Sequence, residues 1–290
     1  MEKEDLQPKP PDQTADARKA KRLLARVVFF FLLINGAILY KVLQSPEPTY
    51  QGKTVTEWIS TIGVVEKPDP QVVNVFGPDA WPSLVRAIGN QDSALKKVYL
   101  KFWQKLSPPT RKKLRRFWPI NAFTLRFNAS MWLMELGPDA KEAVPALIEL
   151  ALHAQNLEIR RSAIHALSFA GAESPDALSA LIEVLKEPEI TVNGTLILDD
   201  TTSFAVARFG SLAKPAVPLL VKSIRSRRNG KPLNEILALG LIGPEAHEAV
   251  PTLVEQLQLR DPLLQANALG ALSDIGPRAA AAANLRPKPK

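Results

Sequence analysis

One short pattern recurs along this chain and limits its possible folds more than any other feature. In its fullest copies it reads GPxAxxAVPxLxxxL. Copies begin at Gly137, Gly171, Gly210, Gly243 and Gly276, and a partial copy begins at Gly77. The four steps between the five glycines from Gly137 to Gly276 are 34, 39, 33 and 33 residues, the length of two short helices with their turns. This spacing indicates a row of helix pairs in which each repeat contacts its neighbours.

The residues around each glycine predict two helices per repeat. Seven, ten and eleven positions after the first four glycines stand apolar residues, which is the spacing of one helical stripe. They are Val144, Leu147, Ile148, Leu178, Leu181, Ile182, Val217, Leu220, Val221, Val250, Leu253 and Val254. The helix before each glycine carries two adjacent core positions. The first holds a small residue in four of the five copies, and the second always holds a large apolar one. These are Trp132, Ala166, Ala205, Ala238 and Ala271, then Leu133, Leu167, Val206, Leu239 and Leu272.

The prolines of the pattern mark boundaries between helices. A glycine fits the left-handed backbone position that closes the preceding helix, and a proline directly after it stops that helix from continuing. A second proline, Pro145, Pro218 or Pro251, then falls in the first turn of the next helix. Its missing N–H breaks no helical hydrogen bond there. What looks like one proline-containing helix is therefore a junction between two.

The pattern GPxAxxAVPxLxxxL, with a second helix ending as in IRRSAIHALSFAG and LLQANALGALSDIG, resembles the HEAT-repeat family, including its short bacterial units. The resemblance covers Phe127 to Ala283 and, less completely, Gly77 to Leu106. It implies an all-α fold, an α-solenoid of HEAT-like helical hairpins, and a scaffold role in protein–protein interaction. Arg126 and Arg160 stand at the start of the second helix in two units, whereas the last unit has Gln265 there. The units therefore do not all share the row of stacked arginine side chains that this position could form.

Three segments depart from the regular repeat. TVTEWISTIG, from Thr54, predicts a first, capping helix with Trp58 and Ile59 facing inward. The segment from Gly77 to Gly137 has room for two units, the second degraded by an insertion around SPPTRKKLRRFWPIN. EITVNGTLIL fits either a short hairpin, because Asn-Gly stands between β-branched runs, or an extended loop, and it accounts for the longest step.

The N-terminal region divides into a tail, an apolar segment and a linker. Residues 1–22 lack periodicity and predict a disordered basic tail. Residues 23–43 are long enough to span a bilayer, with Arg26 and Lys41 near the ends, and predict a transmembrane helix. A cleaved signal peptide and a buried helix are the alternatives, although no small-x-small cleavage site follows. Residues 44–53 predict an extended linker, and 54–290 form the repeat array, with irregular first units.

Basic residues crowd the N-terminal side of the apolar segment. They are Arg18, Lys19, Lys21, Arg22 and Arg26, against Lys41 and Lys53 on the other side. Cytoplasmic flanks of membrane spans carry such an excess. We therefore expect a single-pass membrane protein with a cytoplasmic N-terminus and a repeat domain exported to the periplasmic or extracellular side.

A basic segment runs from Ser93 to Met134, with ten basic residues and no acidic one. Nine of them form the candidate binding surface: Lys96, Lys97, Lys101, Lys105, Arg111, Lys112, Lys113, Arg115 and Arg116. Interleaved aromatic residues suit single-stranded nucleic acid, and some DNA-repair glycosylases resemble HEAT arrays. Export would keep the surface from cytoplasmic nucleic acid and favours anionic lipid or an acidic protein. Alternatively, the aromatic residues belong to the core and the lysines to a solvated face.

The sequence offers no catalytic constellation. It has no cysteine, its three histidines fall on separate expected helices, and HEAVP has Pro251 where a zinc-protease motif needs its second histidine. No phosphate loop or nucleophile elbow occurs. We expect no catalytic, cofactor or metal site, and predict a non-catalytic, membrane-anchored scaffold that binds an unidentified protein. A basic groove for nucleic acid is the second hypothesis. A bilin lyase, an activity of some bacterial HEAT-like proteins, is the third.

Overall fold

The computed structural model describes residues 47–61, 68–114, 120–187, 191–192, 195–196, 199–226 and 231–284. Apart from Glu47, these residues belong to one compact unit, Pro48–Lys290, which we call the repeat domain. The predicted tail 1–22, the predicted anchor 23–43 and residues 44–46 of the predicted linker lie outside the described residues. Within the described ranges, no helix has both the length and the apolar character that crossing a membrane requires.

The repeat domain opens with a hairpin, where the sequence predicts an extended linker. Strand β1 (Thr49–Tyr50) pairs antiparallel with β2 (Lys53–Thr54). Gln51 and Gly52 have φ of 50° and 71°, as a tight two-residue hairpin turn requires. The Trp58 indole of α2 (Val55–Thr61) donates a hydrogen bond to the Tyr50 carbonyl at 3.1 Å. The linker prediction is therefore wrong for residues 49–53, whereas the capping helix with Ile59 buried is confirmed.

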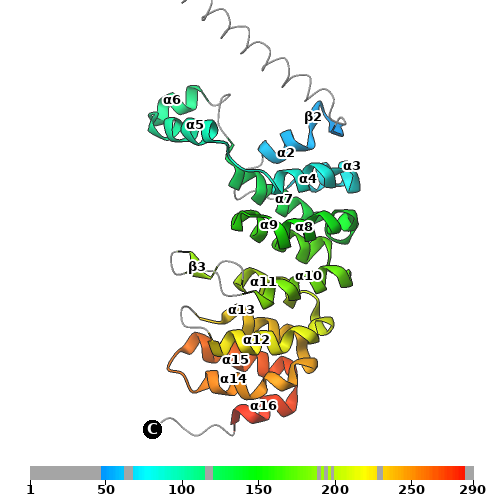
Figure 1. The fold of residues 1–290 in the computed structure, drawn as a ribbon, viewed down its shortest axis with the longest axis vertical. Helices are drawn as coiled ribbons and strands as arrows, with labels where there is room; N and C mark the ends of the chain where they lie inside the picture. The colour runs from blue at the N-terminus through cyan, green and yellow to red at the C-terminus, as the bar shows by residue number, and fades with distance from the viewer. Residues whose placement is uncertain are drawn as a thin grey trace, which may run out of the picture. The chain divides into compact units, whose positions relative to one another are not determined.

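The helices that follow fall into two sets, with α3 (Pro70–Phe76) before the first pair. A helices follow a closing glycine: α4 (Trp81–Ile88), α8 (Val144–His153), α10 (Pro175–Lys186), α12 (Val217–Ser226), α14 (Val250–Leu257) and α16 (Pro277–Asn284). B helices precede one: α7 (Ala122–Leu136), α9 (Leu157–Ala170), α11 (Asp199–Ala207), α13 (Leu233–Ile242) and α15 (Pro262–Ile275). From α7 onward each B helix packs on the next, and from α8 onward each A helix packs on the next. Figure 1 shows these pairs following one another, as an all-α solenoid requires.

Short 3₁₀ helices join α3 and three of the B helices to the A helices that follow them. They are η1 (Gly77–Ala80), η3 (Gly137–Ala143), η4 (Gly210–Ala216) and η5 (Gly243–Ala249). Gly137 closes α7 with a φ of 54° and donates its N–H to the Leu133 carbonyl, while Pro145 lies in the first turn of α8. The prediction that glycine and proline mark helix boundaries is confirmed here. Gly171 is an exception, with a φ of −102°.

One continuous apolar core extends from Val55 to Ala279. The predicted stripe supplies it from the A helices, where Leu147, Leu220 and Leu253 are fully buried. The positions before each glycine supply it from the B helices, where Ala166, Leu167 and their counterparts in other repeats are also buried. Small residues at these positions let adjacent B helices approach closely, and the large ones fill the space between them. The core predicted from periodicity is thus confirmed.

The segment from Gly77 to Gly137 contains one repeat with an insertion, not two repeats. The A helix α4 packs directly on the B helix α7. Between them lie α5 (Ala94–Lys105) and α6 (Pro108–Lys113), which we call the basic hairpin, and neither packs extensively on another described helix. The Asp92 carboxylate accepts the Ala122 N–H, at 3.0 and 3.1 Å from its two oxygens. The two ends of the insertion therefore meet, and the hairpin extends away from the helix rows (Figure 1).

A second insertion lies between α10 and α11. Strand β3 (Thr191–Val192) pairs antiparallel with β4 (Thr195–Leu196), with Thr191 opposite Leu196. Of the two alternatives for this segment, the hairpin is confirmed. The Asn193-Gly194 pair itself lies outside the described residues.

Side chains near the start of three B helices bind carbonyl groups at the end of the preceding A helix. An Arg126 guanidinium nitrogen donates to the Asn90 carbonyl at 2.8 Å, and Arg160 Nε donates to the Ala151 carbonyl at 2.7 Å. In the last pair, Gln265 donates to the Leu257 carbonyl at 3.1 Å. The final carbonyls of a helix have no intrahelical partner, so this contact satisfies them. The change to glutamine therefore preserves the contact.

Candidate interaction surfaces

The B helices expose a row of apolar side chains on one face. Six positions before each closing glycine stand Met131, His165, Phe204, Leu237 and Gly270. Other large apolar residues stand four positions from these, or eight in the case of Phe123, on the same side of the helix. We call the following residues the B-helix row: Phe123, Phe127, His165, Phe169, Phe204, Leu237 and Leu241. Phe123, Phe127, Leu237 and Leu241 are exposed, and the other three are half-buried. His165, Phe204 and Leu237 share one register on three B helices, and Phe123 and Phe127 extend the row onto α7.

Aromatic contacts occur within α7 and within α9, and one joins α9 to α11. Phe123 and Phe127 stack with ring centroids 6.4 Å apart. His165 lies between two rings, 5.2 Å from Phe169 and 6.4 Å from Phe204. A hollow of about 310 Å³ lies beside them, lined by Phe123, Phe127, Ser130, Arg161, Ser162, His165 and Thr201. Three consecutive B helices thus share one concave, largely apolar surface.

Two arginines border this aromatic surface. The Arg208 guanidinium lies 4.0 Å from the centre of the Phe169 ring and donates from Nε to the Ser168 carbonyl at 2.9 Å. Arg161 forms an ion pair with Glu158 at 2.7 Å. Burial, followed by the positive charges of Arg208 and Arg161, holds the pKa of His165 below its usual value. His165 is therefore neutral at pH 7 and extends the apolar surface.

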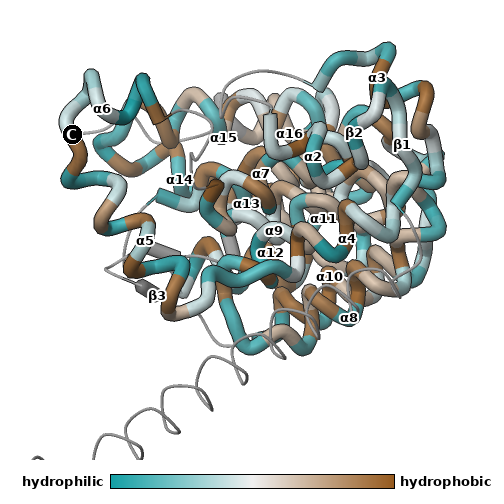
Figure 2. The backbone as a smooth tube through the Cα atoms, turned by 90° about the horizontal axis from the view of Figure 1, so that it is seen from above, coloured by the Kyte–Doolittle hydropathy of each residue, from teal (hydrophilic) through white to brown (hydrophobic). Residues whose placement is uncertain are grey.

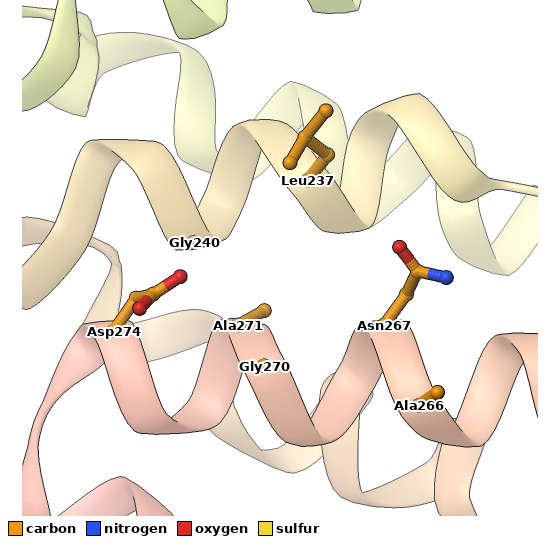
Figure 3. A pocket seen from close by; sticks show the side chains of 7 residues that line it. All are labelled: Leu237, Gly240, Ala266, Asn267, Gly270, Ala271 and Asp274. Atoms are coloured by element: carbon orange, nitrogen blue, oxygen red, sulfur yellow. The ribbon is translucent and has the colours of Figure 1, made fainter.

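A second hollow lies at the other end of the row, between α13 and α15 (Figure 3). It has a volume of about 250 Å³ and is lined by Leu237, Gly240, Ala266, Asn267, Gly270, Ala271 and Asp274. Gly270 occupies the position that holds His165, Phe204 and Leu237 in earlier repeats. The missing side chain leaves room beside Leu237. Asn267 and Asp274 add polar groups to this otherwise apolar hollow.

The predicted basic surface maps largely to the basic hairpin. Four of its lysines, Lys96, Lys97, Lys101 and Lys105, lie on α5, and Arg111, Lys112 and Lys113 lie on α6. Arg115 and Arg116 lie outside the described residues. Lys96 forms an ion pair with Asp92 at 3.0 Å. The structure thus brings seven of the nine predicted residues together on one insertion.

The alternative that the aromatic residues of this segment belong to the core is only partly right. Trp132 is buried in the main core, and Trp103 is also buried although it lies outside that core. Tyr99 and Phe102 on α5 and the two phenylalanines of α7 are exposed. Their exposure creates both the B-helix row and an apolar face on the basic hairpin. The row was not predicted from the sequence, although His165, Phe204 and Leu237 recur at one position of consecutive repeats.

The described residues contain no group of three or more histidine, aspartate or glutamate side chains placed to hold a metal ion. His153 lies on α8, His165 on α9 and His247 in η5, so the structure does not bring them together.

Comparison with known proteins identifies the repeat. Residues 123–195 match the family model described as HEAT repeats. No curated protein matches the chain. Among solved structures, the crystal structure of an engineered protein aligns over 79% of this chain with 20% identity and a TM-score of 0.41. The chain covers 61% of that protein's length. The match of residues 123–195 to the HEAT-repeat model confirms the resemblance that the sequence pattern carries.

Proposed function

We propose that this chain is a non-catalytic, membrane-anchored scaffold that binds another protein through the B-helix row. HEAT repeats commonly mediate protein interactions, and stacked repeats present extended surfaces suited to that task. The observation that carries the proposal is the row itself, in which partly exposed, mostly apolar side chains recur on α7, α9, α11 and α13.

The chemistry of the row suits a protein ligand. Contiguous exposed apolar surface on a soluble domain is characteristic of interaction sites. Aromatic and arginine side chains contribute most to binding energy in protein interfaces. Here Arg208 lies over the Phe169 ring, and Arg161 lines the same hollow as Phe127. The two hollows offer places for large side chains of a partner. We therefore propose a partner segment with at least two apolar anchors, one seated at α7–α9–α11 and one at α13–α15.

The anchor is a separate part of the proposal and rests on the sequence of residues 23–43. The length of this apolar segment and the basic residues before it support a single membrane span with a cytoplasmic N-terminus. Export of the repeat domain would direct the row toward periplasmic or extracellular partners. Such a location also disfavours the nucleic-acid hypothesis.

The role of the row is tested by replacing exposed apolar residues in it and elsewhere. The row variant carries Phe127→Ser, Leu237→Ser and Leu241→Ser. The control variant carries Val75→Ser, Leu212→Ser and Leu259→Ser, which change side chains at least as exposed as Phe127 but outside the row. Both full-length chains are expressed in their native membranes, crosslinked and purified, and the recovered partners are quantified by mass spectrometry.

We expect the row variant to lose its partner by at least about tenfold, because central interface residues each contribute about 1 kcal/mol or more. The control variant should retain the partner at the level of the unmodified chain. Equal retention by both variants would contradict the proposed role of the row. Circular dichroism and thermal unfolding of both variants establish that the substitutions leave the fold intact.

A further inference from the structure

The helix α5 exposes an apolar face that no described part of the chain covers. Leu95, Val98 and Phe102 are 84%, 66% and 58% exposed, and Tyr99 is exposed beside them. Residues spaced three and four apart lie on one side of a helix, so these four side chains form one face. Figure 2 shows apolar and polar residues alternating along α5, to one side of the helix rows. The same residues would be buried in an ordinary core helix.

Basic side chains surround this face. Helical spacing places Lys101 and Lys105 along one border of it and Lys97 on the opposite side of α5. All three lysines are exposed. The following helix, α6, adds Arg111, Lys112 and Lys113. The basic hairpin therefore combines an apolar face with positive charges along its border and on the opposite side of α5.

The positive charge of the hairpin is largely uncompensated within its own segment. From Ser93 to Leu114 there are seven basic residues and no acidic one. Among the residues that the structure describes, Lys96 is the one of these seven with an ion pair, to Asp92 at 3.0 Å. Two exposed lysines in later repeats, by contrast, form ion pairs with acidic residues of the next repeat or helix. Lys214 contacts Glu245 at 2.6 Å and Lys231 contacts Asp261 at 2.7 Å. The hairpin thus retains positive charge for an external anionic ligand.

The geometry points to one occupant: we propose that the basic hairpin docks on the surface of an anionic lipid bilayer. The apolar face of α5 enters the boundary between headgroups and acyl chains, to a depth of about 5–10 Å. Lys101, Lys105 and the bases of α6 contact lipid phosphates, with the lysine stems lying along the apolar boundary. This contact goes beyond the proposed scaffold function and requires neither the protein partner nor the 23–43 anchor.

Other anionic partners fit the hairpin less well. Single-stranded nucleic acid binds aromatic platforms, whereas half of the exposed face, Leu95 and Val98, is aliphatic and cannot stack on bases. A second copy of the hairpin would bring two strongly positive segments together, which is unfavourable. A bilayer surface offers an apolar layer beneath an anionic one. These two layers match the apolar face of α5 and the lysines along its border.

The proposal is tested on the full-length chain, which contains no cysteine and therefore accepts a single introduced one. Phe102→Cys places an environment-sensitive fluorophore on the apolar face, and Lys97→Cys places it on the opposite face as a matched control. Each labelled chain is reconstituted into vesicles of phosphatidylcholine alone or of equal parts phosphatidylcholine and phosphatidylglycerol. Quenching by the neutral, water-soluble quencher acrylamide reports the exposure of the label.

We expect the label at position 102 to shift to shorter emission wavelength and to resist quenching in the anionic vesicles only. The label at position 97 should remain accessible in both lipids. Equal quenching at position 102 in both lipids would overturn the proposal. Shielding of position 102 in detergent without lipid would also overturn it, because another part of the chain or a second copy would then cover the face.

Charge substitutions separate lipid docking from the scaffold function. Lys101→Gln, Lys105→Gln and Lys112→Gln should abolish most of the shielding, because each base near an anionic surface contributes about a fivefold change in affinity. Lys141→Gln, Lys222→Gln and Arg260→Gln remove the same charge from exposed positions elsewhere and should leave shielding unchanged. Equal effects of the two sets would count against the proposal. Loss of the protein partner in the hairpin variant would instead assign the hairpin to protein binding.

Discussion

At the scale of single residues, the repeats use different side chains for the same task and the same position for different tasks. Arg126, Arg160 and Gln265 all bind carbonyl groups at the end of a preceding A helix. Sequence comparison of the repeats registers only the change from arginine to glutamine. It does not show that both side chains reach the same group, because that depends on where the preceding helix ends.

His165 provides a prediction at this scale. Its folded pKa is lowered by burial and by Arg208 and Arg161. The unfolded chain therefore binds a proton first as the pH falls below about 6.5, the ordinary histidine pKa. The stability contributed by neutral His165 is fully present above that pH and is lost as the pH falls toward the folded pKa. We expect the melting temperature to decrease between pH ~7.5 and ~5.5, either side of that ordinary value.

His165→Phe should remove most of this decrease, since phenylalanine keeps the ring contacts without a titrating group. His153→Gln is the matched control, because the His153 side chain is 65% exposed. It should leave the decrease in place. An unchanged pH dependence in the His165→Phe chain would show that another group is responsible.

At the scale of helices, two glycines at the α13–α15 contact have opposite roles. A Cβ on Gly240 of α13 would lie 3.0 Å from Ala271 Cα, so glycine is needed for the close approach of the two helices. A Cβ on Gly270 of α15 would meet nothing within 4 Å, because this residue faces the hollow shown in Figure 3. Sequence alone identifies both as poor helix formers and cannot distinguish them.

Gly240→Ala should therefore destabilise the repeat domain by about 1–2 kcal/mol, because the helices must separate to admit the methyl group. Gly270→Ala should stabilise it by about 0.5–1 kcal/mol, because alanine restricts the unfolded chain and meets no obstacle. Urea unfolding followed by circular dichroism measures both changes. Two changes of the same sign would contradict the helix contact described here.

The two insertions show what helix-scale patterns can and cannot predict. The β3–β4 hairpin was one of two alternatives because its Asn-Gly signal is local. The basic hairpin was not foreseen as a separate element, since the contact that closes it joins Asp92 to Ala122 across the whole insertion. Burial acts to raise the pKa of Asp92, but the Ala122 amide and the Lys96 ammonium outweigh it and lower that pKa. The stability that this contact contributes should therefore be present above about pH 4, the ordinary aspartate pKa, and be lost as the pH falls toward the lower folded pKa.

At the scale of the whole repeat domain, the sequence predicts the buried side of the solenoid better than its exposed side. The repeat length, the helix boundaries and core residues such as Leu147 and Leu253 follow from a local period. The B-helix row does not follow from it, because helices such as α13 have apolar residues on more than one face. Only the packing of neighbouring repeats decides that Ile236 is buried whereas Leu237 and Leu241 are exposed.

The most direct test of the central claim is to determine which face of the repeat domain contacts the partner in native membranes. A photo-crosslinking residue, benzoylphenylalanine, replaces Phe127, Phe204 or Leu237 on the row, or Glu149, Glu183 or Lys222 on A helices. Illumination followed by immunoblotting measures the adducts at each position. We predict one shared adduct at the three row positions and none at the three A-helix positions. An adduct confined to the A helices, or equally strong on both faces, would contradict the account.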